Sequence, residues 1–156
     1  MWFTPNMKDK EFKSQIRDYF QHDFDKSSFD FSFTPDYAIY NGFNNTIHIF
    51  EYENSSRGLV QNLTKIAMHF HACENHDPVT VYLVRTLHHQ QNHHQDYQRA
   101  LFLAKKLGYF KLDFKIINEQ DLESEIHELQ LDIEAEDIEA CGGLPYVSKL
   151  EEYLSH

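Results

Sequence analysis

The sequence predicts one compact α/β domain in the order helix, three strands, helix, strand, helix, strand. Apolar residues recur at helical spacing in three segments, and five short segments are rich in alternating or continuous aromatic and β-branched residues. With 41% hydrophobic residues among 156, the chain can bury a sizeable core. No apolar run reaches the length of a membrane helix, so we expect a cytoplasmic protein without a membrane partner.

The first helix is expected over residues 7–22, where apolar side chains share one face. Residues 28–34 alternate phenylalanine with polar residues at period two, which predicts a half-buried strand. A second strand is expected over 36–40, because the turn-forming pair Asn41-Gly42 follows it. The third strand, residues 46–53, is rich in β-branched and aromatic side chains.

The second half of the predicted domain alternates helices and strands, as in a three-layer α/β fold. Cap-forming residues precede a helix over about 57–72, and a continuous apolar run at 79–84 predicts a strand that is buried on both faces. The polar composition of residues 86–95 predicts a loop. A helix near 96–107 and an alternating strand at 110–117 complete the series.

The negative charge is confined to the C-terminal quarter of the chain. Residues 1–118 hold thirteen acidic and thirteen basic residues, whereas residues 119–156 hold twelve acidic residues and one lysine, which accounts for the net charge of −11. We expect a core of residues 1–118 and an acidic extension, residues 119–156, packed on it. Apolar residues spaced among the acids predict a helix over 119–139, and a short one is expected at 146–154.

The two cysteines, Cys73 and Cys141, show no spacing typical of a disulfide framework or of a thiolate zinc site. We therefore expect free thiols.

Three carboxylates are predicted to converge near the ends of the second and third strands. Glu51 and Glu53 are two residues apart and so project from one face of a strand. A hairpin closed by the Asn41-Gly42 turn would bring Asp36 opposite them. Because like charges in contact disfavour ionisation, such a cluster indicates a divalent cation, and oxygen ligands suit Mg²⁺ or Mn²⁺.

Pro35-Asp36 followed by Glu51-Tyr52-Glu53, within this order of elements, resembles the PD-(D/E)xK nuclease superfamily, whose restriction-endonuclease-like core is helix, three strands, helix, strand. The resemblance implies that Asp36 and Glu51 bind the metal ion. Glu53 stands where the family has its lysine. Some members supply that lysine from the following helix, where Lys65 is the candidate, and Gln61 resembles a polar residue found beside the site in several members.

The activity that this resemblance implies is metal-assisted hydrolysis of phosphodiester bonds in DNA. Asp36, Glu51 and Glu53 would hold one or two Mg²⁺ or Mn²⁺ ions, and Lys65 would stabilise charge on the phosphate or position the water. Glu11 on the first helix could add a carboxylate, as first-helix acids do in some members. Small nucleases of this kind often act as dimers, so a second copy of the chain is one expected partner.

Two alternatives remain open from the sequence. The missing motif lysine favours an inactive module that keeps the nuclease fold and binds a basic protein through residues 119–156. The histidine-rich stretch at 88–94 favours a metal sensor or store, with His89 and His93 at a helical metal-binding spacing. The histidines of this stretch are His88, His89, His93 and His94.

Overall fold

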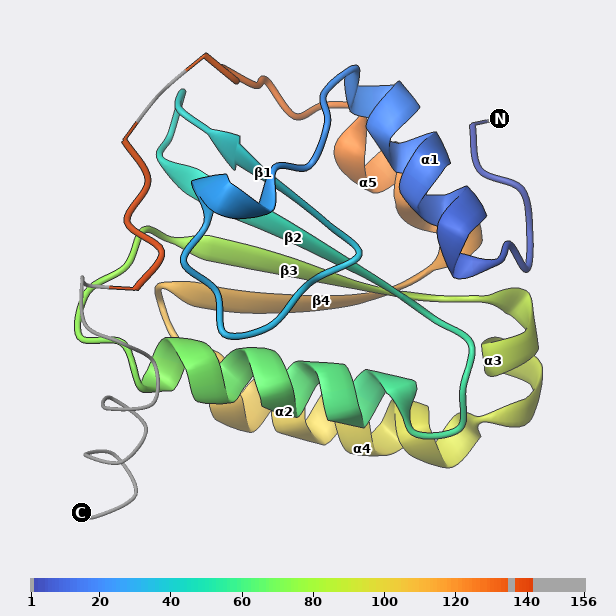
Figure 1. Cartoon of the computed structure of the whole chain (residues 1–156). Helices are drawn as coiled ribbons and strands as arrows, with labels where there is room; N and C mark the ends of the chain where they lie inside the picture. Colours follow the sequence, from blue (N-terminus) through green and yellow to red (C-terminus); the bar gives the residue numbers. More distant parts are fainter. Residues whose placement is uncertain (1, 135–136, 142–156) are drawn as a thin grey trace.

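The protein, described by a computed structural model over residues 2–134 and 137–141, has three layers with a mixed four-stranded sheet in the middle (Figure 1). The predicted α/β class is confirmed. The strand order is β1-β2-β3-β4, with β1 antiparallel to β2 and the other two pairs parallel. The strands are β1 (Tyr37–Asn41), β2 (Thr46–Glu53), β3 (Val79–Arg85) and β4 (Leu112–Asn118).

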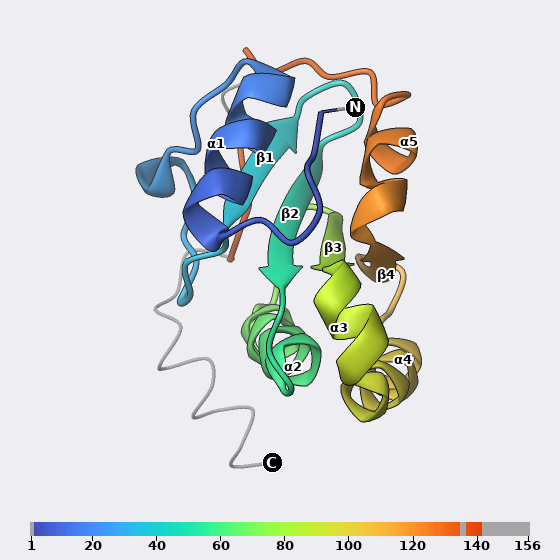
Figure 2. The same ribbon diagram turned by 90° about the vertical axis from the view of Figure 1, so that its right-hand side faces the viewer.

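Helices cover both faces of this sheet. Figure 2, which looks along the layers, shows α2 and α4 side by side on one face and α1 and α5 on the other. The short helix α3 connects β3 to α4. The helices are α1 (Asp9–Phe20), α2 (Gly58–His71), α3 (Leu87–Asn92), α4 (His94–Leu107) and α5 (Leu122–Ile126). The helices predicted over 7–22, 57–72 and 96–107 are thus confirmed, with shifted ends.

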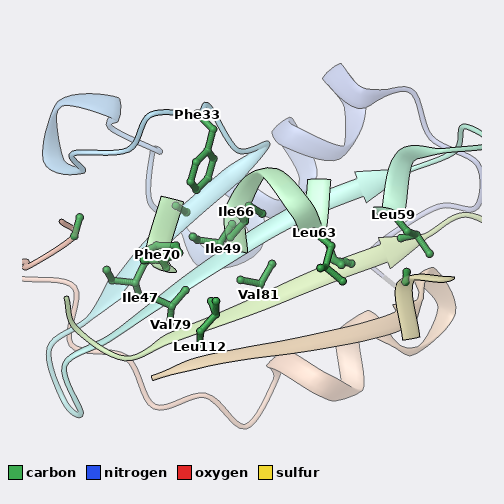
Figure 3. Close-up of a cluster of buried hydrophobic side chains, with 14 of the residues drawn as sticks. Phe33, Ile47, Ile49, Leu59, Leu63, Ile66, Phe70, Val79, Val81 and Leu112 are labelled. Atoms are coloured by element: carbon green, nitrogen blue, oxygen red, sulfur yellow. The ribbon is translucent and has the colours of Figure 1, made fainter. Parts of the chain in front are cut away.

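The first core lies between the sheet and the α2–α4 layer. The apolar stripe of α2 packs on the β2 and β3 side chains, as Figure 3 shows for Leu63, Ile49 and Val81. All three side chains are fully buried. Since Ile47 and Ile49 face this layer, the period of two along β2 also directs Glu51 and Glu53 toward α2.

The second core lies under α1 and α5. Phe12 of α1 stacks on Tyr52 of β2 with ring centroids 4.5 Å apart, and Leu122 and Ile126 of α5 are buried against the same face. Helix α5 therefore contributes these two side chains to the second core.

The strand predicted over residues 28–34 is wrong. A short 3-10 helix, Lys26–Ser28, ends where this segment begins, and the chain then continues irregularly outside the sheet. Its period of two is nevertheless real, because Phe31 stacks on both Phe29 and Phe33. The rings of Phe31 and Phe33 contact Phe70 of α2 edge-on. The phenylalanines thus extend the core without forming a strand ladder, and only two strands precede α2.

Two further predictions fail for local reasons. The polar loop predicted over 86–95 contains α3, because Thr86 caps the helix by accepting the N–H of His89 at 3.0 Å. The acidic helix predicted over 119–139 ends at Ile126. Beyond it, alternate apolar side chains pack on the second core and the chain hydrogen-bonds to Asn41 at the end of β1. These side chains are Leu129, Leu131 and Ile133.

The cysteine prediction is also wrong, because Cys73 and Cys141 form a disulfide across a separation of 68 residues. The helix predicted at 146–154 lies outside the described residues. Over residues 2–134 and 137–141, none of the helices combines the length and apolar character needed to cross a membrane.

A buried polar network joins α2 to α4. Asp96 of α4 accepts the backbone N–H groups of Leu59 and Val60 at 3.0 and 3.2 Å, and so caps the start of α2 from a neighbouring helix. His89 Nε2 donates to Asp96 at 2.8 Å, while its Nδ1 accepts from Arg85 Nε at 3.1 Å. Burial lowers the pKa of His89, which keeps the imidazole neutral in this arrangement.

Replacing this cap should destabilise the fold. Asp96→Ala leaves the N–H groups of Leu59 and Val60 and the His89 ring without their acceptor, and we expect a loss of about 2 kcal/mol or more in the free energy of unfolding. Urea denaturation followed by circular dichroism measures it. Gln95→Ala, at an exposed neighbouring position of α4, is the control and should change stability little. Equal stability of the two variants would contradict the capping role.

Candidate active site

The candidate site lies where β2 extends beyond β1. Tyr37 pairs with Phe50, so the last three residues of β2 have no partner in β1. Asp36 replaces the missing ladder contact, because its Oδ2 accepts the backbone N–H of Tyr52 at 2.7 Å. The predicted hairpin is therefore confirmed, and it places Asp36 beside the end of β2.

Glu51 and Glu53 are buried at this end of β2, with exposed fractions of 4% and 7%. Glu51 Oε1 is enclosed and has no hydrogen-bond partner among the described residues. The Glu53 carboxylate lies against Gly58, the first residue of α2, where a Cβ atom would collide with Glu53 Oε2. A glycine at this position lets the carboxylate approach the helix start closely.

Burial raises the pKa values of all three carboxyl groups, and nearby carboxylates raise them further. Burial is the larger cause for Glu51, followed by the charge of Asp36, and its pKa rises to about 8. The pKa of Glu53 also rises to about 8, through burial and then through Glu51 and Asp36. Burial raises the pKa of Asp36 against the opposing hydrogen bond from Tyr52. Without a cation, this site therefore holds protons at neutral pH.

Two lysines flank the carboxylates from opposite helix layers. Lys65 of α2 lowers the pKa values of Asp36, Glu51 and Glu53, and its Nζ lies 5.6 Å from the centre of the Phe33 ring. Lys13 of α1 lies 3.8 Å from Asp36 Oδ1. The structure thus brings Lys65 near the predicted carboxylates, and it adds a cation that the sequence analysis did not consider.

Gln61 and Glu11 are less closely involved. Gln61 is exposed one turn before Lys65, and its backbone N–H donates to the Arg57 carbonyl at the start of α2. Glu11 is also exposed. The first-helix acid whose charge acts on Asp36 and Glu53 is Asp9 instead. Asp9 and Lys13 lie one helical turn apart on α1, but this spacing alone does not indicate that they approach the end of β2.

A divalent cation suits the donor chemistry of Asp36, Glu51 and Glu53. The unpartnered, enclosed oxygen of Glu51 needs either a proton or a cation, and carboxylate oxygens are the ligands that Mg²⁺ and Mn²⁺ prefer. The three carboxylates are not gathered into a ready ligand set, however. In the described residues, the one closely gathered set of three potential ligands lies elsewhere, at His69, Cys73 and Cys141.

The histidine-rich stretch 88–94 forms no such set in the described part of the chain. His89, the buried member, is engaged by Asp96 and Arg85. His88 and His94 are exposed, and His88 Nδ1 lies 3.1 Å from the Asn92 amide. This arrangement gives His89 a structural role.

No family model, curated protein or solved structure matches this chain. Its function therefore has to be inferred from the site itself.

The raised pKa values predict a pH-dependent stability for the metal-free protein. Glu51 and Glu53 keep their protons to about pH 8 when folded but lose them near 4.5 when unfolded. Between these values the folded state binds more protons, so the two carboxyls make stability fall as pH rises, with no further loss above about 8. Glu51→Gln removes one such group, and its stability relative to wild type should increase from pH 5.5 to pH 8.

Urea denaturation in the presence of a chelator measures this difference. Titration of the buried histidines is common to both proteins and cancels in the comparison. Glu11→Gln, at an exposed position, is the control and should stay parallel to wild type. A Glu51→Gln curve that is also parallel to wild type would show that Glu51 ionises normally in the folded protein.

Proposed function

We propose that this protein is a metal-dependent nuclease that hydrolyses phosphodiester bonds in DNA. The observation that carries the proposal is the buried Glu51, whose Oε1 lacks a partner beside two further carboxylates and a lysine. Structural ion pairs place opposite charges together, whereas this site buries like charges. Burying like charges costs stability, which fits a site arranged to receive a cation.

The PD-(D/E)xK resemblance supplies the substrate class. A bound Mg²⁺ or Mn²⁺ polarises a phosphate and lowers the pKa of a coordinated water. Asp36 and Glu51 would hold the ion, with Glu53 as a third ligand. Lys65 would approach the non-bridging oxygens and stabilise the charge that develops during attack. Gln61, one turn earlier on α2, stays a predicted contact at the rim of the site.

An inactive partner-binding module is the second candidate, and one observation favours it. The described part of the acidic segment, residues 119–134 and 137–141, exposes a row of carboxylates that a basic protein surface could meet. These residues are Asp121, Glu125, Glu128, Asp132, Glu134, Asp137 and Glu139. Such a module needs no ion at Asp36 and Glu51, so metal-dependent cleavage separates the two candidates.

The nuclease proposal predicts DNA cleavage that requires both the ion and the carboxylates. Purified protein with Mn²⁺ or Mg²⁺ should cut supercoiled and single-stranded DNA, and a chelator should stop it. Asp36→Asn and Glu51→Gln should each lower the rate by ~100-fold or more, because they remove ligand charge while keeping side-chain size. Lys65→Met should lower the rate with a smaller effect on metal affinity.

Gel electrophoresis of the products measures these rates, and Glu11→Gln is the control, expected to cleave like wild type. Cleavage that survives Asp36→Asn and Glu51→Gln would indicate a contaminating nuclease. A folded wild-type protein that cuts neither DNA form with either ion would favour the partner-binding module.

Metal affinity at this site should rise steeply with pH. Protons on Glu51 and Glu53 compete with the cation until the pH passes about 8. Isothermal titration calorimetry with Mn²⁺ should therefore show binding that tightens by ~10-fold or more between pH 6.5 and pH 8.5, with proton release. Glu51→Gln should weaken binding and reduce this dependence. An affinity that is the same at both pH values would contradict the raised pKa values as its cause.

A further inference from the structure

The far end of α2 holds a second cluster of ligand-type side chains, distant from the carboxylates. His69, Cys73 and Cys141 offer one imidazole nitrogen and two sulfurs that all lie within 4.8 Å of one another. His69 is fully buried, Cys141 is 3% exposed and Cys73 is half-buried. His69 and Cys73 are one helical turn apart at the end of α2, and Cys141 comes from the chain that follows the acidic segment.

The approach of Cys141 to Cys73 does not depend on the disulfide alone. Glu139, two residues before Cys141, forms two hydrogen bonds with Asp77. Its carbonyl accepts the Asp77 N–H at 2.6 Å, and its N–H donates to the side-chain Oδ2 of Asp77 at 2.8 Å. Its carboxylate accepts from Asn75 at 2.9 Å. Ala140 is buried in the first core. These contacts would hold the two sulfurs near each other after reduction.

His69 is positioned by a hydroxyl. Ser32 Oγ lies 3.0 Å from Nδ1, and His69 Nε2 faces Cys73 Sγ at 3.8 Å. In the disulfide form Nδ1 accepts the Ser32 N–H at 3.4 Å, and the imidazole also hydrogen-bonds to the Ala140 backbone. Binding of an ion through Nε2 would therefore move the ring proton to Nδ1, which can then donate to the Ser32 hydroxyl. Histidine ligands of metal ions are commonly oriented in this way, by a hydrogen bond from the second ring nitrogen.

We propose that the dithiol form of this protein binds Zn²⁺ through His69, Cys73 and Cys141, and that the disulfide is the metal-free, oxidised form of the same site. Two thiolates and an imidazole are a preferred zinc ligand set, with a water completing the tetrahedron. Zinc–sulfur bonds of about 2.3 Å place two sulfurs about 3.8 Å apart, so the sulfurs must separate from their bonded positions when the disulfide is reduced. A small rotation of the side chains after reduction provides this distance.

The chemistry balances with a thiol as the reductant. Two small thiols reduce the Cys73–Cys141 disulfide to two thiols and are themselves oxidised to a disulfide. Zn²⁺ then displaces one proton from each cysteine thiol, and two protons leave to solvent. In either form the site connects residue 141 to α2, so zinc would maintain in a reducing compartment the link that the disulfide makes under oxidation.

Cobalt substitution in the full chain tests this proposal. The protein is reduced with a trialkylphosphine, which becomes the phosphine oxide and leaves no competing thiol, and is then titrated with Co²⁺ and with Zn²⁺ without oxygen. We expect one thiolate-bound ion per chain, with the visible bands of tetrahedral Co²⁺ and a sulfur-to-cobalt charge-transfer band. One equivalent of Zn²⁺ should displace this ion. The oxidised protein should show none of these bands.

Variants assign the ligands. Cys73→Ser and Cys141→Ser should remove the charge-transfer band, and His69→Gln should weaken Co²⁺ binding by at least ~10-fold and shift the visible bands. His127→Gln, at an exposed histidine, is the control and should bind like wild type. The double variant Asp36→Asn/Glu51→Gln should retain the spectrum, which separates this site from the carboxylate site.

Three results would overturn the proposal. The first is a reduced protein that keeps its circular dichroism spectrum yet shows no thiolate band with Co²⁺. The second is a reduced protein that loses its fold, because the anchoring contacts of Glu139 would then be insufficient. The third is a band that is insensitive to His69→Gln, which would place other ligands around the ion.

Discussion

The burial of Glu51 and Glu53 on the helix-covered face of β2 is the constraint on which this end of the sheet depends. Strand periodicity directs both side chains into the same layer as Ile47 and Ile49, where water cannot solvate a charge. The surroundings adapt to it: a glycine begins α2 where Glu53 approaches, and lysines from two layers face the carboxylates. Burial and neighbouring carboxylates still raise the pKa values of Glu51 and Glu53, because the lysines lower these values only in part.

Helix α2 connects this constraint to the rest of the molecule. Its first turn meets Glu53 and is capped by Asp96 of α4, and its last turn carries His69 before Cys73. Fourteen residues separate the two ends by roughly 20 Å, so the carboxylate cluster and the thiol cluster are distinct sites on one rigid element. Occupation of one site can be studied without altering the ligands of the other.

The sheet differs from the nuclease core that the sequence predicted, because one of the three strands expected before α2 is missing. Only two strands precede α2, because the phenylalanines of residues 29–33 stack on one another and on α2 instead of pairing with β1. From Asp36 through the hairpin, α2 and the parallel strand β3, the elements follow the order that the sequence predicted for this stretch. This part contains every residue assigned to the proposed nuclease reaction, including the glutamate at the position of the motif lysine.

The sequence by itself determined the features set by local periodicity: the three long helices, the four strands of the sheet, the apolar stripe of α2 and the shared face of Glu51 and Glu53. It also placed Asp36 opposite them, since a short turn fixes the register of a hairpin. Where the spacing of apolar residues fits more than one structure, only the tertiary structure decided which one forms. A period of two describes residues 29–33 equally well as a strand or as a stack of rings, and packing on α2 selects the latter. The contact of Asp9 and Lys13 with the site, the cap that Asp96 supplies to α2, and the approach of Cys141 to Cys73 join residues far apart in the chain. Such contacts follow from how the layers pack, and local sequence spacing carries no record of them.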